Sequence, residues 1–363
     1  MVLTARRKTP LAVCHTLVNR HIGGAERHIL DLCRVMRVRG HHPAILLASN
    51  VPLEPLIYEM GITLREMPPT NDIDPRTPFR VSAQLSALEA DILNVHDNAA
   101  AILCCLGGRL ARVPVVATVH AFHDKWPFIA ADHLIAVSEA LRNHLLGQGF
   151  PANRVTLVRN GVDLNHFIPG NREQARRNLE LDSDRCYFIF LGRLTQGKGI
   201  GKLLEIFRRL HDELPRTGLL IVGNGPQSAE LRQYVTRHAL EQEVRFFGYC
   251  ESIRPALTAA DCLVLPSARE GLGLVLLEAM ACARAAIATD AGGPREVIRP
   301  RETGFLVPPD DGEALYAAMH SATLNPSWRE DAGLAGRRCV EEHHSLETQV
   351  DGIEDVYERL LQQ

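Results

Sequence analysis

The sequence has few aromatic residues, no long hydrophobic run and little net charge. Phe, Trp and Tyr make up 5% of the chain, which leaves few side chains on which nucleic acid bases stack. The net charge is −3, so the chain has no overall excess of the basic residues that neutralise phosphates. The apolar stretch near the N-terminus is short and continues into a strand pattern. These features predict no nucleic acid partner, no signal peptide and no membrane span.

The cysteines also lack a pattern. None of the nine forms a Cys-x-x-Cys pair, and most lie in apolar segments such as AILCCLGG and ADCLVLPS. Small buried reduced thiols explain this distribution better than disulfides or a metal site. Reduced thiols indicate a reducing compartment, so we expect a cytoplasmic protein, with peripheral contact at the inner face of the cytoplasmic membrane left open.

The chain has a repeating pattern of apolar runs and helical segments. Its 363 residues exceed one ordinary core and suit two domains. Runs that are apolar on both faces, separated by helices, predict parallel sheets covered on both sides. We therefore expect an α/β protein with two Rossmann-like doubly wound domains facing across a cleft. The expected strands are 10–18, 43–49, 62–67, 91–96, 113–120, 133–138 and 155–162, then 187–192, 218–225, 244–249, 261–267, 285–290 and 303–309.

The polar, turn-rich segment NGVDLNHFIPGNREQ places the domain boundary near residue 165. The prediction is an N-terminal domain over 1–165, a C-terminal domain over 166–345 and an amphipathic helix over 346–363 that packs back across the domains. Helices of the second domain are expected at 199–210, 226–239 and 274–283.

Two glycine-rich segments follow expected strands, where such a fold binds ligands. In FLGRLTQGKGI, Arg193 and Lys198 lie among glycines and suit a diphosphate, although two solvated surface cations have the same pattern. In NRHIGGAERH, Gly23 and Gly24 open a helix whose N-terminus favours an anion. Neither segment has the Gly-x-Gly-x-x-Gly spacing of a dinucleotide site.

The stretch EGLGLVLLEAMA contains two acids in an apolar setting. Its Gly-Leu-Gly turn joins an expected strand to an expected helix, so the amides of Gly271, Leu272, Gly273 and Leu274 form an anion cradle. Glu270 at the mouth of this cradle would repel a phosphate and instead suits hydroxyl groups. Glu278 lies about two turns into the helix, where a ribose diol would supply hydrogen-bond donors. An exposed surface helix is the alternative interpretation.

These segments resemble those of retaining glycosyltransferases of family 4, which have the GT-B fold. The resemblance covers nearly the whole chain, because ten short segments occur in the order of the family. They are GGAERH, ATVH, AVSEAL, NGVD, GRLTQGKG, IVGNGP, VRFFGY, EGLGLVLLEAMA, GGPREVI and TGFLVPPDD.

The resemblance implies a nucleoside diphosphate sugar as donor, UDP-sugar ahead of GDP-sugar, and no cofactor or metal. It places Arg193 and Lys198 on the diphosphate, Gly24 under it, Glu270 and His120 on the donor sugar and Glu278 on the ribose. It further implies transfer to a glycan or glycolipid acceptor in cell-envelope glycan synthesis, lipopolysaccharide or related.

Alternatives remain open from the sequence. A nucleotide-sugar epimerase shares the architecture and needs no acceptor, whereas a dinucleotide-dependent oxidoreductase or a non-catalytic sugar-binding protein fits less well. Asp72 and Asp74 form an Asp-x-Asp pair, but we expect no metal in their Pro-rich loop. The loop HDKWPF is a candidate membrane-touching or acceptor-gating segment. Other histidines near strand ends are interpreted as satisfied polar residues, namely His15, His21, His28, His96 and His123.

Overall fold

The computed structural model describes residues 9–17, 24–48, 54–67, 74–96 and 101–362. The chain forms two compact units, one made of residues 1–160 with 346–363 and the other of residues 161–345. The sequence placed the boundary near 165 and the last helix across both domains. The structure divides the chain between Asn160 and Gly161, and the last helix belongs to the first unit.

The first unit is built on a parallel sheet. Within the described residues it has seven strands in the order β3-β2-β1-β4-β5-β6-β7, a doubly wound arrangement. Each expected strand of this half is present, because its residues are apolar on both faces and both faces are covered. The strands are β1 Ala12–Leu17, β2 His42–Ala48, β3 Thr63–Met67, β4 Ile92–Val95, β5 Val115–Val119, β6 His133–Ala136 and β7 Val155–Leu157.

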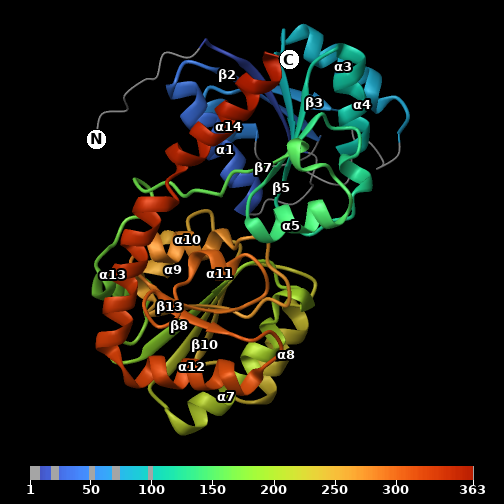
Figure 1. Cartoon of the computed structure of the whole chain (residues 1–363). Helices are drawn as coiled ribbons and strands as arrows, with labels where there is room; N and C mark the ends of the chain where they lie inside the picture. The colour runs from blue at the N-terminus through green and yellow to red at the C-terminus, as the bar shows by residue number, and fades with distance from the viewer. Residues whose placement is uncertain (1–8, 18–23, 49–53, 68–73, 97–100, 363) are drawn as a thin grey trace. The chain divides into compact units, whose positions relative to one another are not determined.

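Helices cover both faces of this sheet. Helices α3, α4 and α5 pack on one face, against Leu93, Val95 and Ala117. Helices α1 and α14 lie side by side on the other face, against Ile92 and Val116 (Figure 1). The helices are α1 Gly24–Val38, α2 Glu54–Glu59, α3 Thr77–Ala87, α4 Ala101–Ala111, α5 Glu139–Gly147 and α14 Leu346–Leu361, with short 3-10 turns η1 Trp126–Phe128 and η2 Ala152–Arg154.

The last helix is tied to the first unit by buried polar contacts as well as apolar ones. The Tyr357 hydroxyl accepts a hydrogen bond from the Asn94 amide of β4 at 2.6 Å. Arg39, which follows α1, donates to Glu354 at 3.1 Å, and the His41 ring lies 3.2 Å from the same carboxylate. Because these partners come from β4 and from the connection between α1 and β2, α14 is an integral layer of the first unit.

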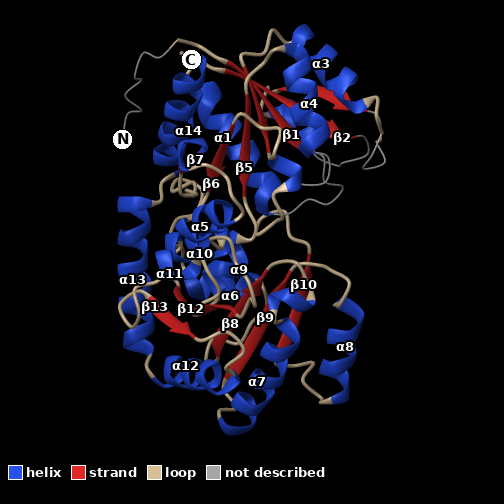
Figure 2. Cartoon of the chain, turned by 45° about the vertical axis from the view of Figure 1, so that its right-hand side comes forward, coloured by secondary structure: helices blue, strands red, loops and turns tan. Residues whose placement is uncertain are grey.

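The second unit repeats this architecture. Among its residues the sheet has six parallel strands in the order β10-β9-β8-β11-β12-β13, which is the same winding as in the first unit (Figure 2). All six expected strands are present, so the sequence prediction of two doubly wound α/β domains is confirmed. They are β8 Cys186–Leu191, β9 Thr217–Val222, β10 Val244–Gly248, β11 Cys262–Leu265, β12 Ala285–Thr289 and β13 Gly304–Val307.

The helices of the second unit enclose two buried clusters, one on each face of the sheet. The three helices expected from the sequence are present as α7, α8 and α10, with ends shifted by at most three residues. The helices are α6 Arg172–Asn178, α7 Ile200–Glu213, α8 Ser228–Arg237, α9 Arg254–Ala259, α10 Leu274–Ala281, α11 Pro294–Val297, α12 Gly312–Leu324 and α13 Pro326–His343, with the 3-10 turn η3 Gln196–Lys198.

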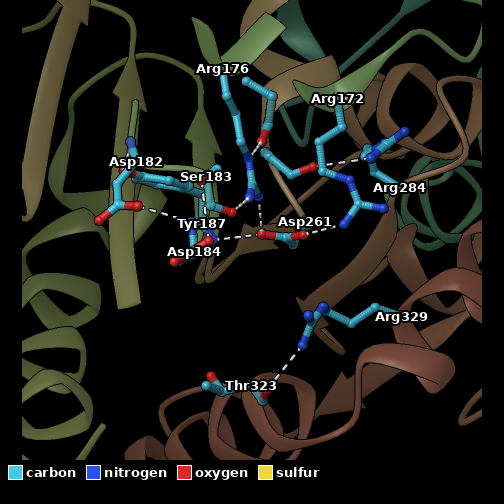
Figure 3. A network of polar contacts seen from close by, with 12 residues as sticks. Arg172, Arg176, Asp182, Ser183, Asp184, Tyr187, Asp261, Arg284, Thr323 and Arg329 are labelled. Atoms are coloured by element: carbon cyan, nitrogen blue, oxygen red, sulfur yellow. Dashed lines mark hydrogen bonds and ion pairs between the residues drawn. The ribbon is translucent and has the colours of Figure 1, made fainter. Parts of the chain in front are cut away.

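A charged network lies at the edge of the second sheet where the strands begin. Asp261, the residue before β11, is buried and accepts hydrogen bonds from Arg172 and Arg176 at 2.6 Å each and from the Tyr187 amide at 2.7 Å (Figure 3). Burial, followed by the nearby charge of Arg172, lowers the pKa of Arg284. Every partner of this carboxylate belongs to the scaffold, so the network is structural, and the opposite edge of the sheet is left for ligands.

Candidate functional site

Glycines bring the loops at the strand ends of the second sheet into close contact. A Cβ on Gly223, after β9, would lie 1.9 Å from the carbonyl oxygen of Gly192, after β8. A Cβ on Gly199 would lie 2.1 Å from the carbonyl oxygen of Pro266, after β11. Only glycine permits these distances, so three loops converge at the switch point between β8 and β11.

The two cations of the first of these loops have different surroundings. Arg193 is exposed, and the described residues provide no hydrogen-bond or ion-pair partner for its guanidinium group. Lys198 ends η3, and its ammonium group donates to Glu270 Oε2 at 2.7 Å. The structure thus brings together two of the predicted site residues, which the sequence had assigned separately to a diphosphate and a sugar.

The loop that carries Glu270 is held rigidly. The Glu270 amide donates to the carbonyl of Ala291, and the Gly293 amide donates to the carbonyl of Glu270, both at 3.0 Å. A Cβ on Gly293 would lie 2.0 Å from the carbonyl oxygen of Gly271, so the two segments are in backbone contact. Ser267 donates to Glu270 Oε2 at 2.9 Å. The segment 291–293 therefore fixes the backbone of Glu270, while Lys198 and Ser267 fix its carboxylate. The sequence did not identify Ser267 as its partner.

Helix α10 begins directly after this loop, as the sequence predicted. Gly273 precedes it with a φ of 91°, a conformation that favours glycine, while Gly271 and Leu272 are buried. The first amides of a helix have no acceptor within the helix, so those of Leu274 and Val275 are available to an anion, whereas the Leu276 amide donates to the carbonyl of Gly273 at 2.8 Å. Glu278 is partly buried. Its exposure is therefore intermediate between the buried acid expected from the sequence and the exposed alternative.

A hollow of about 250 Å³ lies at the same edge of the second sheet. It is lined by residues that follow several strands, among them Gln196, Pro266, Thr289 and Asp311. Arg193, Lys198, Glu270 and Glu278 are not part of this lining. The hollow therefore adjoins the predicted site rather than coinciding with it.

The predicted residues of the first unit lie at the ends of β1 and β5. Gly24 is the first residue of α1, and Gly23 and His21 lie outside the described residues. His120 follows β5, and its Nε2 lies 3.1 Å from Nδ1 of His96, which follows β4. His96 Nε2 lies in turn 2.9 Å from Nδ1 of His15 in β1. From the sequence, His15 and His96 are interpreted as satisfied polar residues, and the one available signal was that His96 and His120 each end an expected strand.

The remaining sequence predictions concern metal and membrane. Asp72 lies outside the described residues, and Asp74 is hydrogen-bonded to Arg80 at 3.2 Å. The part of the chain that the structure describes contains no group of three His, Cys, Asp or Glu side chains arranged to hold a metal ion. No helix within that part is both long and apolar enough to cross a bilayer. In the loop 123–128, Trp126 is exposed and Phe128 is buried.

Two doubly wound units, the second with converging glycine loops, have the architecture of the GT-B fold. Residues 171–338 match the family described as "Glycosyl transferases group 1", and residues 22–166 match the family described as "Glycosyltransferase Family 4". The chain belongs to this family of glycosyltransferases.

Sequence relatives support the assignment. The chain is 34% identical over 315 residues to alpha-maltose-1-phosphate synthase of Mycolicibacterium smegmatis, covering 72% of this chain and 80% of the relative. It is 29% identical to phosphatidyl-myo-inositol mannosyltransferase of Mycobacterium tuberculosis, covering 88% of each chain.

Solved structures show the same fold. A glycosyltransferase of Rickettsia africae superposes with a TM-score of 0.85 at 21% identity, covering 98% of this chain and 99% of that chain. HepE of Anabaena, solved in complex with UDP and glucose, gives a TM-score of 0.85 at 20% identity, covering 95% of this chain and 99% of that chain.

Proposed function

We propose that the chain transfers a sugar from a UDP-sugar to a hydroxyl group of a glycan or glycolipid acceptor, with retention of the anomeric configuration and without a metal ion. The observation that carries this proposal is the grouping of Lys198, Glu270 and the start of α10 at one edge of the second sheet. A cation and free helix amides suit a diphosphate, and a carboxylate beside them suits sugar hydroxyls.

Charge is the chemical problem that these groups address. The diphosphate gains negative charge as the bond to the sugar breaks, and the sugar becomes oxocarbenium-like. Arg193, Lys198 and the amides after Gly273 would stabilise the leaving diphosphate in the role that a metal ion has in other enzymes. Glu270 would hold the sugar hydroxyls, and Glu278 the ribose. By resemblance to the family, His120 would contact the donor sugar, and the departing phosphate would accept the proton of the acceptor hydroxyl.

The substrate class is supported by the relatives. HepE was solved with UDP-glucose, which favours UDP as the nucleotide, with GDP as the alternative. The mannosyltransferase named above acts on a phosphatidyl-inositol lipid, and a structural neighbour with a TM-score of 0.71 is a lipopolysaccharide outer core galactosyltransferase. We propose a cell-envelope glycolipid acceptor reached from the cytoplasmic face of the membrane.

The test incubates the purified chain with UDP-glucose, GDP-mannose or ADP-glucose and a bacterial glycolipid extract, with and without EDTA. We expect UDP-dependent transfer that EDTA does not abolish, and an NMR coupling constant showing that the product keeps the donor's configuration. Arg193→Ala should lower the rate by ~10²-fold, whereas Arg237→Ala, at an exposed position of α8, should not. Conversion of UDP-glucose without any acceptor would instead identify an epimerase, and an inverted product or an absolute need for a divalent ion would refute the mechanism.

A further inference from the structure

Three histidines from adjacent strands form a continuous row in the first unit. In the pairing of β1 with β4, His15 is level with Asn94, so His96 lies two residues further on the same face. The pairing of β4 with β5 makes Asn94 level with Val116. His120 therefore lies on the same face, two residues further along the strand direction than His96. The register therefore produces a diagonal row across the switch point of the sheet, with adjacent rings inclined by 21° and 26°.

His15 and His96 are buried, His120 is partly buried, and all three rings are neutral. His15 is fully buried, and burial lowers its pKa to about 4. Burial, followed by the neighbouring His28 and His123, lowers the pKa of His120 to about 3. Burial and the adjacent histidines also hold the pKa of His96 well below its usual value. At neutral pH each ring therefore carries a single N–H.

Neutral rings impose a rule on the two hydrogen bonds of the row. Each bond needs one N–H and one bare nitrogen, and His96 uses both of its nitrogens. If His96 donates from Nδ1 to His120, its Nε2 must accept from His15, and all three rings carry the proton on Nδ1. If the bonds run the other way, all three carry it on Nε2. The row thus has two states, and in each state the three rings share one tautomer.

The ends of the row are open. His15 Nε2 and His120 Nδ1 are buried atoms without a hydrogen-bond partner among the described residues. A buried polar atom without a partner costs free energy, so each of these two nitrogen atoms would gain from a hydrogen bond to a bound group. In either state one end is a donor and the other an acceptor.

We propose that His15 and His96 are positioning residues that set the tautomer of His120, so that the row decides whether His120 presents an N–H or a lone pair at Nδ1 to the substrate. This inference rests on the role proposed above for His120. A substrate group that accepts a hydrogen bond from Nδ1 selects the state with all protons on Nδ1, and a group that donates selects the other. His15 therefore acts on the sugar through two rings without touching it.

The first test is spectroscopic and needs no substrate. Histidine labelled with ¹⁵N distinguishes protonated from bare nitrogens, and single asparagine variants assign the three rings. We expect His15, His96 and His120 to show the same tautomer in the wild-type protein, and His96→Leu to uncouple the outer two. Different tautomers within the wild-type row would overturn the inference.

The second test measures turnover. His15→Leu removes the partner of His96 Nε2 and should change the His120 tautomer and lower kcat ~10-fold, the scale of losing an orienting partner. His15→Asn keeps an amide at the position of Nδ1, so it should stay within ~3-fold of wild type. His133→Asn, on β6 and bonded to Thr156, is the control for losing a strand histidine. If His15→Leu changes neither tautomer nor kcat, the positioning role is excluded.

The two tests separate this inference from the proposed function. Absence of any transferase activity would remove the proposed function while leaving the shared tautomer measurable. Normal sugar transfer combined with different tautomers in the three histidines would refute the inference about the row and leave the proposed function standing.

Discussion

At the scale of single residues, the contact between Lys198 and Glu270 changes how the site is understood. The sequence shows only a cation and an acid 72 residues apart, with separate assigned partners. In the structure each neutralises part of the charge of the other, and Ser267 bonds the same carboxylate oxygen. A diphosphate would therefore share the ammonium group with Glu270. One N–H of Lys198 bonds Glu270, and the others can donate to the diphosphate.

The two acids of this segment should respond differently to loss of charge. Glu270→Gln weakens the hold on Lys198, so UDP affinity should be unchanged or tighter while kcat falls, by ~10²-fold. Glu278→Gln should weaken UDP binding by about 1.5 kcal/mol, because a neutral amide is a poorer acceptor for ribose hydroxyls. Calorimetry with UDP and steady-state kinetics measure both quantities.

The control for these variants is Glu302→Gln, at an exposed acid of the same unit. It should change neither constant. If Glu270→Gln loses UDP affinity while Glu278→Gln retains it, the two roles are exchanged.

At the scale of helices and strands, Asp261 ties α6 to the sheet of the second unit. Asp261→Asn removes the charge that compensates buried Arg176, and breaking such a pair costs about 3–5 kcal/mol. We expect the denaturation midpoint of the second unit to fall accordingly. Trp328, stacked on Phe305 at 4.2 Å, reports this transition in a Trp126→Phe background.

Asp182→Asn is the matched control, because the Asp182 side chain is 53% exposed and pairs with Arg185 at the surface. Its midpoint should stay close to that of the parent. Equal midpoints for both variants would show that the buried network does not stabilise the unit.

Elements were easier to predict than contacts. The strand 261–267 and the helix from Leu274 could be predicted because apolar runs and glycine turns are local signals. The contacts within the histidine row could not, although His96 and His120 end expected strands, because the contacts depend on the register between β1, β4 and β5, which local sequence does not encode. The pairing of Lys198 with Glu270 depends likewise on backbone contacts between loops that are distant in sequence.

At the scale of the whole molecule, the first unit is discontinuous in sequence. Its buried cluster beneath α14 combines Val13, Ile92 and Val116 of the sheet with residues of the last helix. The second unit is a single continuous segment, 161–345. The chain therefore crosses between the units twice, after Asn160 and after Ser345.

Removal of residues 346–363 should unfold the first unit selectively. The deletion exposes apolar surface under Val350, Ile353 and Val356, each worth ~1.5–3 kcal/mol when buried. Limited proteolysis with mass spectrometry should then show loss of fragments from 1–160 and survival of 161–345. Deletion of only 362–363 should leave the digestion pattern unchanged. Survival of 1–160 in the longer deletion would show that α14 is dispensable.

The return of α14 to the first unit also fixes an order of events on the ribosome. The first 160 residues leave the exit tunnel early, but the helix that closes their core is synthesised only after residues 161–345. At roughly 5–20 residues per second, the apolar face under α14 waits on the order of ten seconds or more while 161–345 is made. The first unit can therefore complete its core only after every residue of the second unit has been synthesised.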